Sequence, residues 1–451
     1  MPREKKIQNK PIQAAQKTKK NSKTRSVFGR SAFSRLSRVE PMLPGGFRDY
    51  GPADAIERAR MLGVVRNTFE TFGFDPMETA SIQRKEVLFG GEQESEKIVF
   101  ETKGSREKTS DTALRFDLTV PFARFMAANP EIPKPFKRYQ IGTVWRGESP
   151  QAGRYREFMQ ADIDIVGSSS LDADAEVIAA IYWTLKNMGI DDFVIKINSR
   201  KVFSELLQEP GFDNNQIKNL DEIIREIDKE PKIGLDAVRK NITGFAGRDT
   251  AEAVMAFLQK PVTDPDLLEI KKIAQDCGVE NIVIDKKIAR GLSYYTGMVF
   301  ETFLTKAPEM GSIASGGRYD ELIAPFTGQK IPAVGASIGI DRLFAAREKL
   351  GMAEKKATLT KALVLNLSSE LKSDYLSIVK QLRDAEIPTS FYLGDDTSFQ
   401  AQLSYAVKKE IPFVVIYGDK EKQSGNVAVK NLMTREQKEM PIAELTGFFK
   451  Q

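Results

Sequence analysis

Residues 138–167 read RYQIGTVWRGESPQAGRYREFMQADIDIVG, and they predict a β-hairpin. Two runs of alternating residues stand on either side of a short segment that contains Gly147, Pro150 and Gly153. Aromatic and β-branched residues favour strands, whereas glycine and proline favour reversals of the chain. We therefore expect two antiparallel strands joined by a loop.

The second strand of this hairpin has two chemically different faces, because side chains two positions apart share a face of a strand. One face is apolar except for Glu157, and it carries Tyr155, Met159, Ala161, Ile163 and Ile165. The opposite face carries Arg156, Phe158, Gln160, Asp162 and Asp164. An isolated polar face usually points to solvent, so a solvent-facing strand and a functional face are both open interpretations at this point.

Charged residues at the mouth of the hairpin favour the functional interpretation. Arg146 and then Glu148 end the first strand, and Arg154 follows the reversal of the chain. A planar guanidinium group can bind a phosphate group through two hydrogen bonds. This arrangement indicates a ligand that carries phosphate.

The composition excludes several classes of chemistry. The 451 residues contain no histidine and a single cysteine, Cys277. A Ser-His-Asp triad, a Cys-His pair, an HExxH zinc helix and a disulfide framework are therefore excluded. The proportions of hydrophobic residues (41%) and charged residues (29%) are typical of a soluble globular protein, without an apolar run as long as a membrane span. Any catalysis must rely on arginine, lysine, carboxylates, tyrosine, backbone amides and metal-bound water, and the lone cysteine favours a reducing compartment.

The positive net charge of +5 belongs to the first forty residues. Residues 1–40 hold twelve Lys or Arg against Glu4 and Glu40, a formal charge of +10, which leaves −5 on the other 411 residues. A segment this basic and this poor in periodic apolar residues predicts a disordered tail. A solubilising extension, an arm that binds tRNA or ribosome, and an organellar presequence are all compatible with it.

The remaining chain predicts two domains. A catalytic domain over residues 41–350 mixes strands with helices, and its segment 201–279 is charged, helical and interrupted by prolines, which indicates a helical insertion. A lysine-rich linker at 351–360 precedes alternating strands and helices in residues 361–451, which predict a small α/β domain.

At this point the sequence resembles a known family. The segment WRGESPQAGRYREFMQ between its two strands resembles motif 2 of class II aminoacyl-tRNA synthetases, and most closely that of the histidyl-tRNA synthetases. Four further segments match the same family in order: LRFDLTVPFAR (114–124), ARGLSYYTGMVFE (289–301), GSIASGGRYDELI (311–323) and GASIGIDRL (335–343). The last ninety residues resemble the anticodon-binding domain of such enzymes. The resemblance implies an α+β fold, with a class II antiparallel sheet flanked by helices, a helical insertion and a C-terminal α/β anticodon-binding domain.

The resemblance also implies an ATP site. Arg146 would contact the α-phosphate and the substrate carboxylate, and Arg290 would neutralise the α-phosphate from the other side. Arg342 would cover the adenine, whose other face would stack on Phe158, and reach the γ-phosphate. Glu148 would meet the adenine amino group, and Arg154 would be a second phosphate contact. Mg²⁺ would bridge the phosphate oxygens, without any metal ligands assigned in the protein.

The same resemblance implies a histidine site. The α-amino group would be bound by Asp117, Thr119 and Gln160. The ring nitrogens would face Asp164 and Tyr295, with Tyr294 adjacent and Arg290 close to the bound amino acid. The implied function is ATP-dependent ligation of L-histidine to tRNA(His) through a histidyl-adenylate, by a cytoplasmic histidine–tRNA ligase that forms a homodimer.

Three departures from the family pattern leave details open. Ser293 stands where an aspartate is usual, and Ser149 and Ala152 stand in the motif 2 loop where cations are common. The main alternative function is an inactive synthetase-like regulatory subunit of ATP phosphoribosyltransferase. A synthetase-derived tRNA sensor and a class II enzyme of another specificity are further alternatives. The presence of Arg146, Arg290 and Arg342 and of the C-terminal domain argues against a regulatory subunit.

Overall fold

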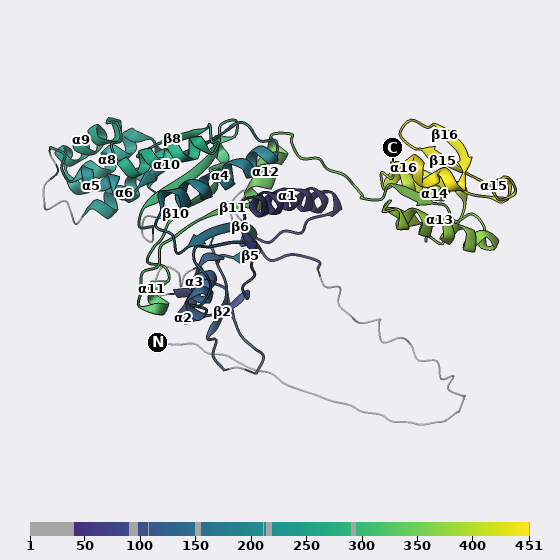
Figure 1. Ribbon diagram of the computed structural model, residues 1–451, viewed down its shortest axis with the longest axis horizontal. Coiled ribbons are helices and arrows are strands. Elements are labelled where there is room, and N and C mark those ends of the chain that lie inside the picture. The colour runs from purple at the N-terminus through teal and green to yellow at the C-terminus, as the bar shows by residue number, and fades with distance from the viewer. Residues whose placement is uncertain are drawn as a thin grey trace, which may run out of the picture. The chain divides into compact units, whose positions relative to one another are not determined.

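The computed structural model describes residues 40–89, 98–106, 108–148, 155–210, 212, 219–289 and 295–450 (Figure 1). The chain divides into two compact units, Met1–Pro44 and Gly45–Gln451. Every helix and strand given below belongs to the second unit. The basic tail predicted for residues 1–40 lies outside the described residues except for Glu40.

The centre of the catalytic region is an eight-stranded sheet in the order β1-β5-β6-β11-β10-β9-β7-β8. Its strands are β1 (Asp75–Pro76), β5 (Phe136–Trp145), β6 (Glu157–Val166), β7 (Phe193–Ser199), β8 (Ile282–Ile284), β9 (Met298–Leu304), β10 (Ser312–Arg318) and β11 (Ala333–Gly339). The six inner strands pair antiparallel, and only the short edge strands β1 and β8 pair parallel with their neighbours. The antiparallel sheet expected from the resemblance is confirmed.

The predicted hairpin is the pair β5 and β6. The two strands pair over their full length, from Phe136 opposite Val166 to Trp145 opposite Glu157. The apolar face of β6 lies in the main core, where Ala161 and Ile163 are fully buried. The polar face is turned to the other side, so the predicted alternation is confirmed within the strand.

Tyr155 is an exception, and its assignment to the apolar face was wrong. β6 begins at Glu157, two residues later, so the alternation of the strand does not extend to Tyr155. Its hydroxyl accepts a hydrogen bond from Arg48 at 3.2 Å, and its ring lines a cavity instead of the core.

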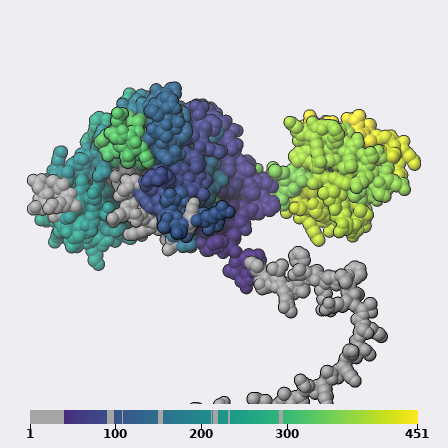
Figure 2. All heavy atoms as spheres, turned by 90° about the horizontal axis from the view of Figure 1, so that it is seen from below, coloured from purple at the N-terminus to yellow at the C-terminus, as the bar shows by residue number. Residues whose placement is uncertain are grey.

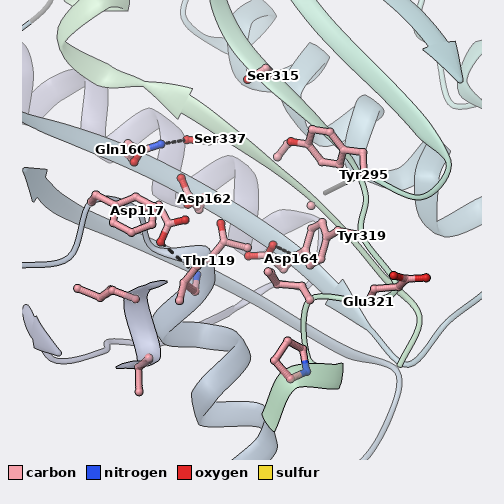
Figure 3. A pocket seen from close by; sticks show the side chains of 18 of the residues that line it. Asp117, Thr119, Gln160, Asp162, Asp164, Tyr295, Ser315, Tyr319, Glu321 and Ser337 are labelled. Carbon is pink, nitrogen blue, oxygen red and sulfur yellow. Dashed lines mark hydrogen bonds between the residues drawn. The ribbon is translucent and has the colours of Figure 1, made fainter. Parts of the chain in front are cut away.

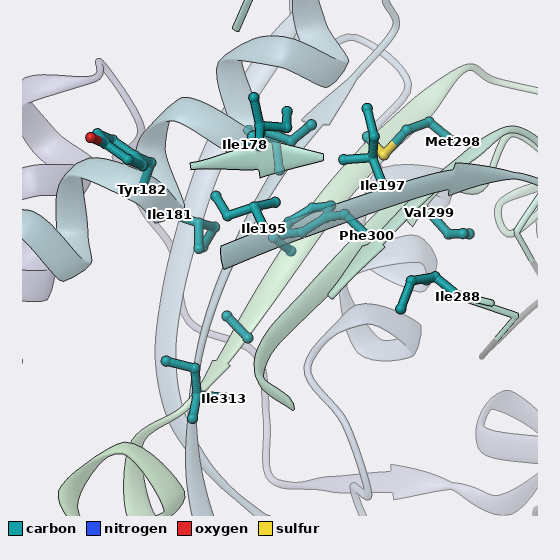
Figure 4. Packing of buried hydrophobic residues seen from close by; sticks show 14 of the residues in the cluster. Ile178, Ile181, Tyr182, Ile195, Ile197, Ile288, Met298, Val299, Phe300 and Ile313 are labelled. Atoms are coloured by element: carbon teal, nitrogen blue, oxygen red, sulfur yellow. The ribbon is translucent and has the colours of Figure 1, made fainter. Parts of the chain in front are cut away.

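Helices cover the apolar face of this sheet. Figure 4 shows isoleucines of α4 and β7 packed against Phe300 and Met298 of β9. The helices of the catalytic region outside the insertion are α1 (Pro52–Thr71), α2 (Lys85–Phe89), α3 (Thr119–Ala128), α4 (Leu171–Asn187), α11 (Ala324–Thr327) and α12 (Ile340–Lys349), with the 3₁₀ turn η4 (Pro308–Met310). A small separate sheet contains β2 (Ile82–Arg84), β3 (Glu101–Thr102) and β4 (Thr112–Leu114).

The chain between β7 and β8 is helical. It contains α5 (Val202–Leu206), α6 (Leu220–Asp228), α7 (Glu230–Ile233), α8 (Leu235–Ala246), α9 (Arg248–Gln259) and α10 (Pro265–Asp276). In Figure 1, α5, α6, α8 and α9 gather in one cluster. These helices occupy most of the segment 201–279 for which an insertion was expected.

The C-terminal region has its own five-stranded sheet, in the order β13-β12-β14-β15-β16. Its elements are β12 (Ala362–Val364), η5 (Ser369–Leu371), α13 (Lys372–Asp384), β13 (Thr389–Phe391), α14 (Phe399–Lys408), β14 (Phe413–Ile416), α15 (Asp419–Ser424), β15 (Asn426–Asn431), β16 (Gln437–Pro441), η6 (Ile442–Glu444) and α16 (Leu445–Lys450). One apolar cluster joins the sheet to α13 and α16, and a second joins its other strand residues to α14. Residues of this region gather into one compact body in the space-filling view (Figure 2). The predicted α/β character is confirmed.

A buried ion pair connects the first and last helices of the catalytic region. Glu57 of α1 is fully buried and lies 3.2 Å from the guanidinium group of Arg347 of α12. Arg347 also donates to the carbonyl oxygens of Met188 and Met352, both at 2.7 Å. The pair therefore joins α1, the end of α4 and the end of α12 on the apolar side of the sheet.

We predict that Glu57→Ala lowers the free energy of unfolding by about 3–5 kcal/mol, because it leaves the buried charge of Arg347 without a counter-ion. Arg60→Ala is the matched control, since Arg60 pairs with the same carboxylate from a position that is 41% exposed. That change is expected to cost less than about 1 kcal/mol. Chemical denaturation of both variants measures the difference, and equal losses would contradict the prediction.

Candidate active site

A cavity of about 750 Å³ opens over the polar face of β6. Among the residues that line it are six singled out from the sequence: Asp117, Thr119, Arg146, Gln160, Asp164 and Tyr295. Figure 3 shows all of these except Arg146, converging from the loop before α3 and the start of that helix, from β6 and from the segment before β9. Residues that are far apart in the sequence thus surround one space, which we call the first cavity.

A second cavity of about 250 Å³ lies beside it. It is lined by Glu148, Phe158 and Arg342, together with residues of β10 and β11. Arg146, Gln160, Ser315 and Ser337 line both cavities, so these four residues form their common boundary. Arg154, Arg290 and Tyr294, the other predicted site residues, lie outside the described residues.

Both described arginines of the predicted site are held by backbone contacts. The Nε of Arg146 donates to the carbonyl oxygen of Phe116 at 3.0 Å, and its guanidinium carbon lies 5.1 Å from the centroid of the Phe158 ring. Arg342 is the third residue of α12, and its Nη1 donates to the carbonyl oxygen of Ser312 in β10. The second cavity therefore carries two guanidinium groups and an aromatic face, which suit a phosphorylated ligand with a ring.

The start of α12 is tied to β6 by one carboxylate. Asp341 accepts hydrogen bonds from the hydroxyl of Tyr50, from Nη1 of Arg58 at 2.6 Å and from the backbone N–H of Met159 at 2.6 Å. Asp341 immediately precedes Arg342, so this network sets the position of Arg342 relative to the polar strand. These residues were not identified from the sequence, because their contacts join segments nearly three hundred residues apart.

The floor of the first cavity is a buried ion pair between Arg138 and Asp164. Their side chains face each other across the hairpin at 2.6 Å, and Asp164 also accepts a hydrogen bond from the hydroxyl of Tyr319. The guanidinium carbon of Arg138 lies 4.2 Å from the centroid of the Phe122 ring. Sequence reasoning missed Arg138 and Tyr319, although the hairpin register could have indicated Arg138.

Two glycines leave the space that the side chains at this floor occupy. A Cβ atom on Gly335 of β11 would lie 2.1 Å from Oδ1 of Asp164, far inside the contact distance of the two atoms. A Cβ atom on Gly317 of β10 would lie 2.8 Å from the ring of Tyr295. Gly335 of β11, the strand beside β6, and Gly317 of β10, the strand beyond it, therefore leave room for an acidic and an aromatic side chain of the cavity.

Burial changes the titration of the acids in the first cavity. It raises the pKa of Asp117 to about 6, against the lowering effects of the Val120 N–H and of Arg146. It raises the pKa of Asp162 to about 7, where Arg138 acts in the opposite direction and Asp164 adds to the increase. The cavity thus holds more carboxylates than nearby cations can neutralise, which favours a ligand with a positively charged donor.

The described residues contain neither a cluster suited to a metal ion nor a helix suited to span a membrane. No group of three or more cysteine, aspartate or glutamate side chains among them is arranged to hold a metal ion. Within the same part of the chain, none of the helices has the length and apolarity of a membrane span.

The mixed sheet with a carboxylate-rich cavity beside an arginine-lined cavity is the catalytic core of a class II aminoacyl-tRNA synthetase. Residues 46–343 match the family model described as histidyl-tRNA synthetase, and residues 361–451 match that of an anticodon-binding domain. The chain belongs to the histidyl-tRNA synthetase family. It is 37% identical to the histidine–tRNA ligase of Treponema denticola over 90% of this chain and 97% of that protein.

Solved structures agree with this assignment. The histidyl-tRNA synthetase of Nostoc sp. PCC 7120 matches with a TM-score of 0.80 and 31% identity, over 92% of this chain and 99% of that chain. A protein of Bacillus halodurans C, described as an ATP phosphoribosyltransferase regulatory subunit/histidyl-tRNA synthetase, matches with a TM-score of 0.68 over 82% of this chain and 97% of that chain. Its identity is only 21%, so it shares the fold without bearing on activity.

We predict that Gly335→Ala destabilises the protein by about 1–3 kcal/mol, because the added methyl group must displace an Asp164 carboxylate that Arg138 and Tyr319 hold in place. Gly339→Ala in the same strand is the control, since its Cβ would have no neighbour closer than 3.8 Å. Urea denaturation of the two variants tests this, and equal midpoints would contradict the steric argument.

Proposed function

We propose that this protein joins L-histidine to tRNA(His) in an ATP-dependent reaction that passes through a histidyl-adenylate. The observation that carries the proposal is the common boundary of the two cavities, at which Arg146 stands between buried carboxylates and the arginine-lined space. An amino acid in the first cavity would direct its carboxylate toward this boundary. ATP in the second cavity would present its α-phosphate to the same place.

The first step does not depend on a general base. A carboxylate oxygen of histidine attacks the α-phosphorus of ATP, a new P–O bond forms, and the bond to pyrophosphate breaks. The attacking carboxylate is already ionised at neutral pH, so a general base is not needed. The protein must align the reactants and neutralise charge, and a chain without histidine is able to do both.

The second step transfers histidine to RNA. A ribose hydroxyl at the 3′ end of tRNA(His) attacks the carbonyl carbon of the adenylate, and AMP leaves. The match of residues 361–451 to an anticodon-binding domain supports a second contact with the tRNA, far from the reacting end.

The arginines provide the positive charge for activation. We assign Arg146 to the α-phosphate and the substrate carboxylate, and Arg342 to the adenine face and the γ-phosphate. Phe158 would stack on the adenine, and Glu148, which is exposed at the second cavity, would accept from its amino group. Arg290 is assigned to the α-phosphate and Arg154 to a second phosphate contact, both from the sequence alone.

The carboxylates and amides of the first cavity are assigned to histidine. Asp117, Thr119 and Gln160 would bind the α-ammonium group, and Asp164 and Tyr295 would face the ring nitrogens, with Tyr294 adjacent. The ion pair with Arg138 supports the assignment of Asp164 to a ring nitrogen, because a buried carboxylate remains a charged acceptor only where a cation offsets its charge. Apolar amino acids would leave these groups without partners, which disfavours their binding.

Three further features belong to the proposal. Mg²⁺ would enter bound to ATP and supply positive charge to its phosphate groups, in keeping with its preference for phosphate and water ligands. The protein would act as a homodimer in the cytoplasm. Sedimentation of the purified protein and fractionation of cells test the last two features.

The regulatory-subunit alternative is less well supported. It would not require two arginines and an aromatic face in the second cavity, and it would not require the domain at 361–451. A regulator would bind histidine without activating it, so a single assay separates the two functions.

We predict that ATP–pyrophosphate exchange, measured with each of the twenty amino acids in turn, occurs with histidine alone. The acceptors of the first cavity select a ligand with an α-ammonium group and ring N–H groups. A folded protein that binds histidine without exchange would favour the regulatory subunit, and exchange with another amino acid would refute the specificity.

We also predict that Arg342→Ala lowers the exchange rate roughly 100-fold and raises the KM for ATP, because a guanidinium group that faces the developing charge is lost. Lys349→Ala on the same helix is the control, since Lys349 pairs with Glu309 at the surface. That variant should keep the rate of the parent protein. Unchanged kinetics in Arg342→Ala would remove this residue from the mechanism.

A further inference from the structure

Asp162 is a buried acid that the assignments above do not use. It lies between Gln160 and Asp164 on the polar face of β6, lines the first cavity and is 2% exposed (Figure 3). Among the described residues, its Oδ1 atom has no hydrogen-bond partner. An unpartnered carboxylate oxygen in a protein interior is costly, so at a cavity wall it indicates a ligand that supplies the missing donor.

The contacts of its neighbours explain why this oxygen has no hydrogen-bond partner among the described residues. Nε2 of Gln160 donates to Oγ of Ser337 at 2.6 Å, and the hydroxyl of Ser337 hydrogen-bonds to Asp162. Ser337 donates its single hydroxyl proton to Asp162, and the amide group of Gln160 donates to the oxygen of Ser337. Oε1 of Gln160 also has no partner among the described residues. Two acceptors, Asp162 Oδ1 and Gln160 Oε1, therefore remain on one wall of the cavity.

The charge of Arg138 lowers the pKa of Asp162, but among the described residues no arginine or lysine forms an ion pair with this carboxylate. Arg138 lies 2.6 Å from Asp164, and Arg115 donates to the carbonyl oxygens of Thr79 and Thr143. Asp164 and Asp117 face Asp162 with like charge. Of the three acids, Asp164 has an arginine and a tyrosine, and Asp117 accepts from the Val120 N–H. Among the described residues, Asp162 has the hydrogen bond of Ser337 and the charge of Arg138, without an ion pair of its own.

We infer that Asp162 is the charge partner of the substrate's α-ammonium group, which it binds through Oδ1 together with Oε1 of Gln160. This inference rests on the proposed function and adds a specificity-determining residue to it. The partner of the two acceptors must be a cationic donor that makes more than one hydrogen bond, and an ammonium group has three N–H bonds.

The position along β6 separates the ammonium group from the imidazole ring. Gln160 lines both cavities, so it is close to the boundary where the substrate carboxylate must meet Arg146. The ammonium group and that carboxylate are bonded to the same α-carbon. Asp164 is four residues from Gln160, roughly 13 Å along an extended strand. Asp162 lies two residues from Gln160 and is the nearer of the two acids to the ammonium end.

A functional role for Asp162 has a consequence for stability. Burial raises the pKa of its carboxyl group above that of the unfolded chain, to about 7. Its contribution to stability is therefore present at acidic pH and is lost as the pH rises through about 7. At pH 8 the ionised carboxylate disfavours the folded state, and the ammonium group of the substrate relieves that effect.

The test compares Asp162→Asn with Asp164→Asn, two isosteric changes on one face of one strand, in the full-length protein. The ligands are L-histidine and 3-(imidazol-4-yl)propionate, which keeps the ring and the carboxylate but lacks the ammonium group. Calorimetry measures binding of each ligand, and thermal unfolding measures the Tm between pH 4 and pH 8.

Asp162→Asn is expected to weaken L-histidine binding roughly 10- to 100-fold, as for loss of a charge-assisted hydrogen bond, and to leave binding of the propionate unchanged. It should raise the Tm at pH 8 by about 2–4 °C, with a gain that shrinks toward pH 4. Asp164→Asn should weaken the binding of both ligands and lower the Tm, because it leaves Arg138 buried without a counter-ion.

Several results would overturn the inference. They are unchanged L-histidine binding in Asp162→Asn, equal weakening of both ligands, and a lower Tm or loss of folding at pH 8. Failure of the proposed function itself looks different, since the parent protein would then show no binding of L-histidine or no exchange with it.

Discussion

The ion pair between Arg138 and Asp164 is the contact on which the site depends. Both side chains are almost completely removed from water, and such a pair is stable only with close geometry and additional hydrogen bonds. Among the described residues, Nε and Nη1 of Arg138 have no hydrogen-bond partner, so the pair depends on its 2.6 Å approach and on the remaining bonds of Asp164. Tyr319, just after β10, supplies one of those bonds, and Gly335 of β11 leaves the space for the carboxylate. Three distant segments must be in place together, so the first cavity forms only as the sheet is completed.

The two cavities have opposite electrostatic character. Buried carboxylates dominate the first, and guanidinium groups line the second, with Arg146 at their boundary. A molecule with an ammonium group at one end and a phosphate group at the other matches both environments at once. In the proposed reaction this molecule is the aminoacyl-adenylate, whose charges are distributed in the same order as those of the cavities. Alignment and charge complementarity then account for activation, without a residue that must exchange a proton.

The acids of the first cavity are held in surroundings that disfavour their charge, so their support must come from the rest of the core. Asp341 fixes the start of α12 against β6, and the Glu57–Arg347 pair joins α12 to α1 and α4 on the opposite face. The polar strand is therefore clamped between a rigid apolar layer and the cavity. This separation lets one face of a single strand carry chemistry while the other face supplies stability.

The sequence by itself determined the two faces of β6, because the alternation of a strand follows from its backbone geometry and needs no distant partner. It also determined which chemistry was possible, since a chain without histidine must use arginines and carboxylates. The tertiary structure alone decided that Asp164 pairs with Arg138, that Asp162 has an oxygen without a partner among the described residues, and that Tyr155 lines a cavity. These outcomes depend on strand register, on burial and on neighbours from distant segments, none of which a local pattern of residues contains.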